Sequence, residues 1–233
     1  VHPVHDLTIW NYSPKVQYER LWDDVTLQCR GLVTNSEGKV IARPFKKFFN
    51  YEEYLENNPE MIPNESFEIF EKMDGSLGIL FNYKNDWIMA TRGSFTSDQA
   101  IKGFEMLKKY DYERLLDDYT YLFEIIYDEN RIVCQYDYED IVLLGMIETE
   151  TGEELKLHHT DDYVGRIRFM NIMRNLGFKI VKKYDGINDY KTLKLLVSND
   201  AEGFVVRFKN GFRMKIKGVE YCRLHRILTN ISN

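Results

Sequence analysis

The spacing of hydrophobic and polar residues along the chain predicts many short strands and a few helices. Apolar residues recur at every second position in segments that end at Gly, Asn or Asp, which is typical of antiparallel strands. The predicted strands cover residues 25–34, 39–43, 66–72, 77–83, 87–91, 120–127, 140–147, 202–208 and 212–218. A spacing near 3.6 residues predicts helices over 98–110, 160–177 and 188–196. This mixture indicates the α+β class.

Turn and cap residues separate these elements. Ser36-Glu37-Gly38 predicts a turn between two strands, and Asn210-Gly211 is a strong signal for a tight hairpin. Asp74-Gly75 predicts a tight return between the strands on either side of it. Ser97-Asp98 is suited to begin the first helix, because a serine side chain can accept a hydrogen bond from the first turn. Thr160 is the expected start of the second helix, and Gly177 its end.

The composition is ordinary for a soluble globular protein. The chain has 233 residues, of which 44% are hydrophobic and 29% are charged, enough for one large domain or two small ones. Its apolar runs are far shorter than a membrane span, and its first six residues carry no signal-peptide pattern. Cys29, Cys134 and Cys222 are widely spaced and match no metal-ligand pattern. We therefore expect no membrane association and a reducing compartment such as the cytoplasm.

The charge is unevenly distributed. The formal net charge is −6, but residues 204–226 carry seven cationic side chains and only Glu220 as an acid, a local charge of +6. A basic segment in an acidic chain suits a phosphate-binding site, and the alternative is a solvated hairpin.

The central candidate for chemistry is Lys72-Met73-Asp74-Gly75-Ser76. The lysine ends an apolar-alternating strand, which places a primary amine at the end of a sheet where it can act as a nucleophile. Taken alone, this short motif is also explained as a β-turn with a solvated lysine.

Four further segments follow this motif in a fixed order. They are Thr91-Arg92-Gly93-Ser94, Leu122–Tyr127 with Glu124, Glu202–Val206, and Met214-Lys215-Ile216-Lys217. Glu124 and Glu202 each place one carboxylate beside or within an apolar strand. Lys215 and Lys217 share one face of a strand, because side chains repeat at every second position. Each segment alone has an ordinary structural explanation, but the ordered set favours a single site.

In this order the motifs resemble the covalent nucleotidyltransferase superfamily of ligases and mRNA capping enzymes. The nearest likeness is to bacteriophage-type ATP-dependent RNA ligases that repair broken tRNA. Residues 28–50, which include Arg30, Lys47 and Arg43-Pro44-Phe45, are similar to the region before the lysine in that family. Asn130-Arg131-Ile132-Val133 and Tyr221 also look like that subfamily, and the resemblance covers about residues 9–221. It implies a fold in which antiparallel sheets enclose the nucleotide, with helices packed outside.

The resemblance implies a reaction in three steps. The lysine attacks the α-phosphorus of ATP and leaves lysyl-AMP, and the AMP then moves to a 5′-phosphate on RNA. A 3′-hydroxyl attacks that activated phosphate and releases AMP. The attacking amine must be neutral, which for a free lysine of pKa about 10.4 costs roughly 4.6 kcal/mol at pH 7. Nearby cations, partial burial and a bound Mg²⁺ would favour the neutral amine while neutralising the triphosphate.

The resemblance also implies a role for each matched residue. Lys72 would be the nucleophile, and Asp74 and Gly75 would shape its loop. Arg30, Lys47 and Arg92 would contact ATP phosphates, ribose or the RNA end, and Glu124 would bind the ribose hydroxyls. Glu202 would act through metal-bound water, and Lys215 and Lys217 would hold the α-phosphate and pyrophosphate. Phe49 or Phe123 is a candidate for stacking on adenine, although both fit a hydrophobic core better.

We therefore expect an ATP- and Mg²⁺-dependent RNA ligase that joins 5′-phosphate and 3′-hydroxyl RNA ends. Residues 1–233 would form its adenylyltransferase domain as a monomer in the cytoplasm, or in the host cytoplasm for a viral protein. Ligases of this type usually carry a C-terminal domain that selects the RNA, and only 12 residues follow Tyr221, so we expect no such domain in this chain. Two alternatives stay open: a capping-type nucleotidyltransferase that uses GTP and seals nothing, and a non-catalytic module that binds RNA ends.

Overall fold

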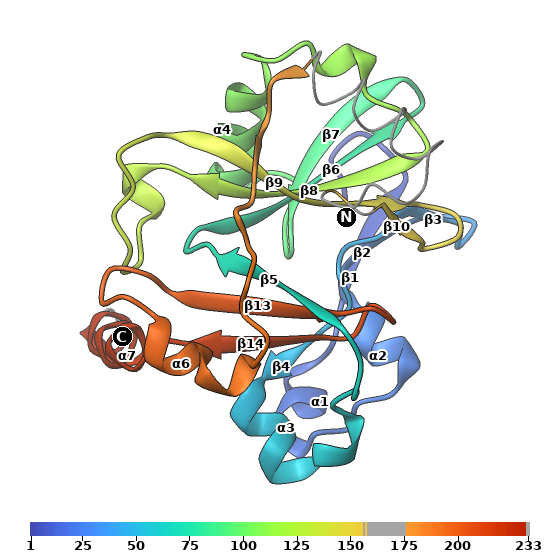
Figure 1. The fold of residues 1–233 in the computed structure, drawn as a ribbon. Coiled ribbons are helices and arrows are strands. Elements are labelled where there is room, and N and C mark those ends of the chain that lie inside the picture. The colour runs from blue at the N-terminus through green and yellow to red at the C-terminus, as the bar shows by residue number, and fades with distance from the viewer. Residues whose placement is uncertain (156, 158–175, 232–233) are drawn as a thin grey trace. The chain divides into compact units, whose positions relative to one another are not determined.

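The structure is a computed structural model that describes residues 1–155, 157 and 176–231 (Figure 1). The chain divides into two compact units, each built from three separate segments. The first unit contains Val1–Lys47, Ser76–Ile125 and Asp140–Ile180. The second unit contains Phe48–Gly75, Ile126–Glu139 and Val181–Asn233. The described residues include no helix that is both long enough and apolar enough to cross a membrane.

Two sheets form the framework of the first unit. The small sheet has the order β1 (Leu7–Asn11), β2 (Arg30–Asn35), β3 (Val40–Ala42). The large sheet has the order β10 (Glu154–Leu155), β9 (Asp140–Glu148), β8 (Tyr119–Ile126), β6 (Ser76–Tyr83), β7 (Asp86–Thr91), and β11 (Lys179–Ile180) pairs in parallel with β9. The helices are α1 (Pro14–Glu19), α2 (Asp24–Gln28) and α4 (Asp98–Leu107), with a short η2 at Tyr112–Arg114. Leu7, Val33, Ile79 and Leu122 lie fully buried in a core shared by both sheets.

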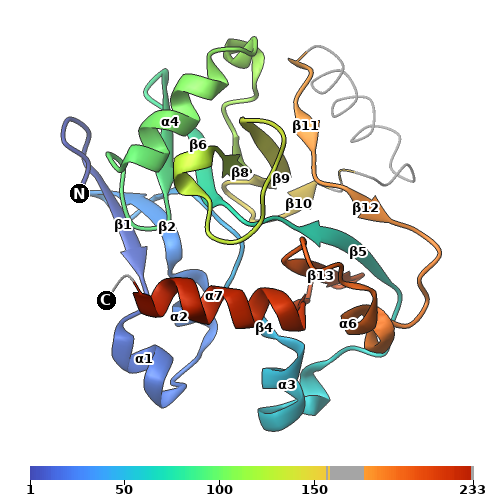
Figure 2. The same cartoon turned by 90° about the vertical axis from the view of Figure 1, so that its left-hand side faces the viewer.

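One sheet forms the framework of the second unit. Its order is β12 (Lys183–Tyr184), β5 (Phe67–Lys72), β13 (Gly203–Phe208), β14 (Arg213–Lys217), β4 (Phe49–Asn50). The helices are α3 (Tyr51–Asn57), α6 (Leu193–Leu196) and α7 (Val219–Ile231), with the short η1 (Pro59–Met61), η3 (Asp128–Asn130) and η4 (Tyr190–Thr192). Figure 2 shows α6 beside the N-terminal end of α7. Ile69, Val206, Met214 and Ile216 are buried on one face of the sheet, and the other face carries charged side chains together with Phe70 and Val205.

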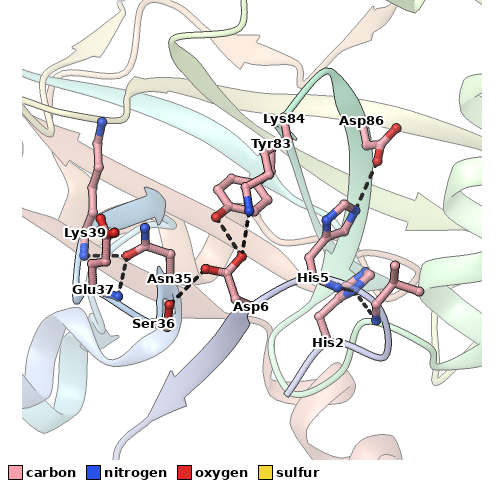
Figure 3. A network of polar contacts seen from close by, with 11 residues as sticks. His2, His5, Asp6, Asn35, Ser36, Glu37, Lys39, Tyr83, Lys84 and Asp86 are labelled. Carbon is pink, nitrogen blue, oxygen red and sulfur yellow. Dashed lines mark hydrogen bonds and ion pairs between the residues drawn. The ribbon is translucent and has the colours of Figure 1, made fainter.

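A polar network fixes the start of β1 in the first unit (Figure 3). The carboxylate of Asp6 accepts hydrogen bonds from Ser36 Oγ at 2.9 Å, Tyr83 Oη at 2.8 Å and Lys84 Nζ at 3.1 Å. The hydrogen bond from Tyr83, followed by those from Lys84 and Ser36, lowers the pKa of Asp6 well below its ordinary value. Because these donors come from two different parts of the unit, the turn after β2 and the end of β6, the network ties the start of β1 to both.

Most of the predicted elements are confirmed, and with them the α+β class. The hairpin at Asn210-Gly211 joins β13 and β14, and the side chain of Ser97 caps α4 by accepting from Ala100 N. The helix predicted at 188–196 is present in shorter form as η4 and α6. The helix predicted from Thr160 lies outside the described residues, apart from its end near Gly177.

Two predictions are wrong. Residues 25–28 form the helix α2 rather than a strand, because Asp23 and Thr26 make a reciprocal capping box that satisfies the first N–H groups. The strands on either side of Asp74-Gly75 do not pair with each other: β5 pairs with β12 and β13, and β6 pairs with β7 and β8. The turn therefore passes the chain from one sheet to another instead of closing a hairpin.

Candidate active site

Three neighbouring strands of the second unit bring the predicted lysines into one row. Gly203 of β13 lies opposite Lys72 of β5 on one side and opposite Lys217 of β14 on the other. Residues directly opposite each other in antiparallel strands point to the same face of the sheet. Lys72 and Lys217 therefore project from the face that the core does not cover, and Lys215 lies two residues before Lys217 on that same face.

Glu202 joins the two lysines. Its Oε2 lies 2.7 Å from Lys72 Nζ and its Oε1 lies 2.7 Å from Lys217 Nζ. The side chain of Glu202 is only 3% exposed, and those of Lys72 and Lys217 are 21% and 25% exposed. A buried carboxylate is costly unless both oxygens are paired, and here each oxygen has its own ammonium partner. The three side chains, called the Glu202 bridge below, thus form a charged cluster with one excess positive charge.

A glycine between the lysines makes this arrangement sterically feasible. Gly203 has a φ of +145°, a backbone conformation that L side chains rarely adopt. A Cβ atom at this position would lie 2.0 Å from the carbonyl oxygen of Ile216, which is far inside van der Waals contact. Only glycine allows β13 and β14 to approach this closely, so the row of lysines depends on it.

The loop after Lys72 is held by a buried carboxylate. Asp74 is 4% exposed and accepts hydrogen bonds from the backbone N–H groups of Val133 and Cys134 and from Tyr221 Oη, all at 2.8 Å. The backbone N–H of Asp74 donates to Tyr136 Oη at 2.9 Å. Because a hydrogen bond to a charged group is stronger than one between neutral groups, this Asp74 clamp fixes the loop that follows the nucleophile candidate.

The buried surroundings of the Asp74 clamp change the pKa of two neighbouring groups. Burial, and then the carboxylates of Glu202 and Asp74, raise the pKa of Tyr221 above its ordinary value. Burial, and then the charge of Asp74, raise the pKa of the Cys134 thiol to about 12. Both groups therefore stay neutral at physiological pH, and Tyr221 keeps the proton that it donates to Asp74.

The basic segment 204–226 is only partly solvated. Arg207 is 8% exposed, and its Nη1 lies 3.5 Å from Glu68 Oε2 on the same face as the lysine row. Lys215 Nζ lies 5.6 Å from the ring centroid of Phe48, within the range of a cation–π contact. The solvated-hairpin alternative is therefore wrong at Arg207 and at Lys217, whose charges face carboxylates.

The first unit gathers the remaining predicted residues. Arg30 begins β2, and burial followed by the nearby charge of Arg92 lowers its pKa from the ordinary value, while Tyr12 and Glu124 act in the opposite direction. Gly31 allows this approach, because a Cβ there would lie 3.2 Å from the Arg92 Cα and 2.8 Å from an Ile79 methyl carbon. The result is a half-buried guanidinium beside a second cation and one carboxylate, which is suited to an anionic or hydroxyl-bearing ligand.

Lys47 lies above two aromatic rings of the same unit. Its Nζ is 5.6 Å from the ring centroid of Tyr12 and 5.7 Å from that of Trp22, and these two rings meet edge to face. Tyr12 Oη also accepts a hydrogen bond from Arg92 Nη1 at 3.5 Å. Sequence reasoning missed Tyr12 and Trp22, although two aromatic residues just before the basic block at 28–50 were an available signal.

The stacking candidates lie in packed surroundings. Phe123 is fully buried and its ring lies 5.1 Å from that of Phe178, and Phe49 packs edge-on against Tyr54 at 5.6 Å.

Sequence reasoning also missed Tyr136 and the backbone donors at Val133 and Cys134, for which the local pattern carries no signal. The structure thus groups Lys72, Asp74, Gly75, Glu202, Lys215 and Lys217 in the second unit and Arg30, Lys47, Arg92 and Glu124 in the first.

Metal ligands are sparse in the described part of the chain, where no group of three His, Cys, Asp or Glu side chains could hold an ion. The Glu202 bridge nevertheless offers one carboxylate beside cations that suit phosphate groups. Mg²⁺ typically binds to one or two carboxylates and takes its other ligands from water and substrate phosphates. The residues present therefore fit a Mg²⁺ ion that arrives with a nucleotide, but not a metal held by protein side chains alone.

Comparison with known proteins shows the family to which the chain belongs. A family model described as RNA ligase matches residues 28–221. The chain belongs to the RNA ligase family. A protein of Autographa californica nuclear polyhedrosis virus, provisionally named a bifunctional polynucleotide kinase/RNA ligase, is 29% identical over 98% of this chain and 35% of its own length. An RNA ligase of Rhodothermus phage RM378 is 25% identical over 97% of this chain and 66% of its own.

Solved structures share the fold. An archaeal ATP-dependent RNA ligase superposes with a TM-score of 0.60 and 17% identity, over 82% of this chain and 52% of that one. A Naegleria gruberi RNA ligase variant with AMP and manganese superposes with a TM-score of 0.59 and 16% identity, over 91% of this chain and 70% of that one. The predicted nucleotidyltransferase fold is thereby confirmed. The chain spans between 35% and 66% of the length of the curated relatives that it matches.

Proposed function

We propose that this chain is the adenylyltransferase domain of an ATP-dependent RNA ligase, with Lys72 as the nucleophile. The observation that carries the proposal is the Glu202 bridge, in which one buried carboxylate holds Lys72 and Lys217 at 2.7 Å each. A solvated lysine at a β-turn would not be held by a buried carboxylate. The order of motifs and the family membership support the same conclusion.

The chemistry of the first step follows from these residues. The Lys72 ammonium loses one proton, and Glu202 Oε2 is the nearest base that can receive it. The neutral nitrogen then attacks the α-phosphorus of ATP, so that an N–P bond forms and the bond to the pyrophosphate oxygen breaks with its electrons on that oxygen. Lys217 and Lys215 lie on the same face and stabilise the negative charge that develops on the phosphate oxygens.

A divalent cation assists this step in the proposed mechanism. When bound, Mg²⁺ neutralises charge on the triphosphate, and Glu202 would hold it through water. Solved relatives that contain ATP or AMP together with manganese support the use of a nucleotide and a divalent metal. In the first unit, Arg30, Lys47 and Arg92 are proposed to bind ATP phosphates or an RNA end, and Glu124 is proposed to bind the ribose hydroxyls.

The substrate in this proposal is RNA with 5′-phosphate and 3′-hydroxyl ends. The AMP passes from Lys72 to the 5′-phosphate, and attack by the 3′-hydroxyl releases it as the strands join. Family membership supports RNA as the substrate class, and repair of broken tRNA follows from the sequence resemblance. Three free cysteines, Cys29, Cys134 and Cys222, support a cytoplasmic location, because thiols stay reduced there.

Nucleotide choice and strand joining test this proposal. The protein is incubated separately with α-labelled ATP and α-labelled GTP plus Mg²⁺, and label retained in a denaturing gel is measured. We expect retention from ATP, and the labelled protein should then join 5′-phosphorylated RNA to a 3′-hydroxyl end. Retention from GTP instead would favour the capping-type alternative, and no retention from either nucleotide would favour the non-catalytic module.

A further inference from the structure

A pocket in the first unit shares Arg92 with the family motifs, but its other lining residues lie outside those motifs. Its volume is about 200 Å³, and it lies at the C-terminal end of β1, where Figure 2 shows α1. The lining residues are Asn11, Tyr12, Pro14, Gln17, Tyr18 and Arg92. The side chain of Tyr18 is 82% exposed, which leaves its ring available to a ligand.

Hydrogen bonds hold the walls of this pocket in place. The backbone N–H of Tyr12 donates to the Cys29 carbonyl at 2.7 Å, and Asn11 Nδ2 donates to the Arg92 carbonyl at 2.9 Å. Ser13 Oγ caps α1 by accepting from the Val16 N–H at 3.3 Å. The wall from β1 is thus fastened to both the residue before β2 and the residue after β7, so the pocket is formed before any ligand binds.

The chemistry of the lining narrows the ligand. The pocket offers the rings of Tyr12 and Tyr18, the amides of Asn11 and Gln17, and the guanidinium of Arg92, and no lining residue is acidic. Planar aromatic faces combined with amide donors and acceptors suit a nucleobase, which stacks on aromatic rings and hydrogen-bonds through its edge. A free phosphate would not use the tyrosine rings, and an aliphatic ligand would leave the amides unpaired.

Arg92 connects this pocket to the cationic cluster of the same unit. Its guanidinium donates to Tyr12 Oη, and its charge acts on Arg30. A nucleic-acid strand has a phosphate on either side of each nucleoside, so a site for one base needs a neighbouring cation. We propose that the pocket binds one nucleobase of the RNA substrate, with the adjoining phosphate at Arg92 and Arg30. This inference rests on the proposed function, because it assigns a subsite for the substrate of that reaction.

The test removes the exposed ring. The wild-type protein is first checked for covalent AMP, and its Kd for a 5′-phosphorylated single-stranded RNA is then compared with that of Tyr18→Ala by fluorescence anisotropy. Loss of one stacking ring should weaken RNA binding roughly 5-fold to 150-fold. Since no charge is removed, the factor should be the same at each salt concentration, whereas loss of a phosphate contact would change the salt slope.

Control variants separate stacking from other effects. Tyr18→Phe keeps the ring and should retain most of the affinity, and Glu19→Ala changes an exposed neighbour on α1 that does not line the pocket. The difference between wild type and Tyr18→Ala should shrink when the RNA carries an abasic position at the bound nucleotide. Thermal unfolding should be unchanged in Tyr18→Ala, because its ring is mostly solvent-exposed.

Each outcome bears on one proposal. Covalent AMP on the wild type together with an unchanged RNA Kd in Tyr18→Ala would overturn the pocket assignment and leave the proposed function standing. A raised KM for ATP in that variant with an unchanged RNA Kd would place the adenine of ATP in the pocket, and would also overturn it. Absence of covalent AMP on the wild type would defeat the proposed function itself.

Discussion

The Asp74 clamp allows a quantitative prediction for Tyr221→Phe. This change deletes a single hydroxyl that donates to a buried carboxylate at 2.8 Å and leaves the ring in place. Asp74 keeps its two backbone donors, so the loss is that of one hydrogen bond to a charged group, about 1.5–3 kcal/mol of the free energy of unfolding. We also expect slower self-adenylylation, because Asp74 positions the loop that follows Lys72.

Urea unfolding followed by circular dichroism measures this loss. Tryptophan fluorescence is unsuitable, because Trp10, Trp22 and Trp87 all lie in the first unit and would report on that unit. Tyr184→Phe is a matched control in the second unit, since the Tyr184 ring packs edge-on against Phe204 and the structure gives its hydroxyl no hydrogen bond among the described residues. If Tyr221→Phe stays within about 0.5 kcal/mol of wild type, the reasoning about the clamp is refuted.

Three further predictions follow from other contacts. Glu202→Gln and Lys217→Ala should each slow self-adenylylation about 10²- to 10³-fold with an unchanged far-UV spectrum; a wild-type rate in either would remove that residue from the site. Gly203→Ala should lower the free energy of unfolding by at least about 2 kcal/mol, because its Cβ would strike the Ile216 carbonyl, and an unchanged urea midpoint would contradict this. Asp6→Asn should lower Tm at neutral pH. Because the pKa of Asp6 is lower in the folded state, its carboxylate stabilises the fold above pH 3.8, and this stabilisation is lost as the pH falls further. The Tm difference between wild type and Asp6→Asn should therefore disappear in acid. A difference that stays constant with pH would count against the network.

Local patterns predicted local structure well. The hairpin at Asn210-Gly211 and the helix capped by Ser97 depend on neighbouring residues, so their signals lie within a few positions of each other. The sequence pattern predicts a strand over residues 25–28, but the capping box of Asp23 and Thr26 starts a helix there instead. The turn at Asp74-Gly75 was mispredicted because the strand that pairs with β5 comes from residues far along the chain, and no local pattern specifies such a partner.

The candidate site also combines features that the local sequence predicts with features that depend on the folded chain. That Lys215 and Lys217 share a face follows from strand periodicity alone, and the structure agrees. That Glu202 reaches both Lys72 and Lys217 requires the pairing of β5, β13 and β14, which only the folded chain provides. The donors to Asp74 from Val133 and Cys134 are backbone N–H groups. The residue types at these two positions therefore do not indicate that they bind Asp74.

The central claim is that Lys72 carries AMP covalently. The most direct measurement incubates wild type and Lys72→Arg with α-labelled ATP and Mg²⁺, and then locates the adduct by mass spectrometry of the digested protein. Arginine keeps the charge but is not deprotonated in proteins, so it cannot attack. The account predicts AMP on the peptide containing Lys72 in wild type and no adduct in Lys72→Arg. An adduct that persists in Lys72→Arg, or that maps to another residue in wild type, would contradict it.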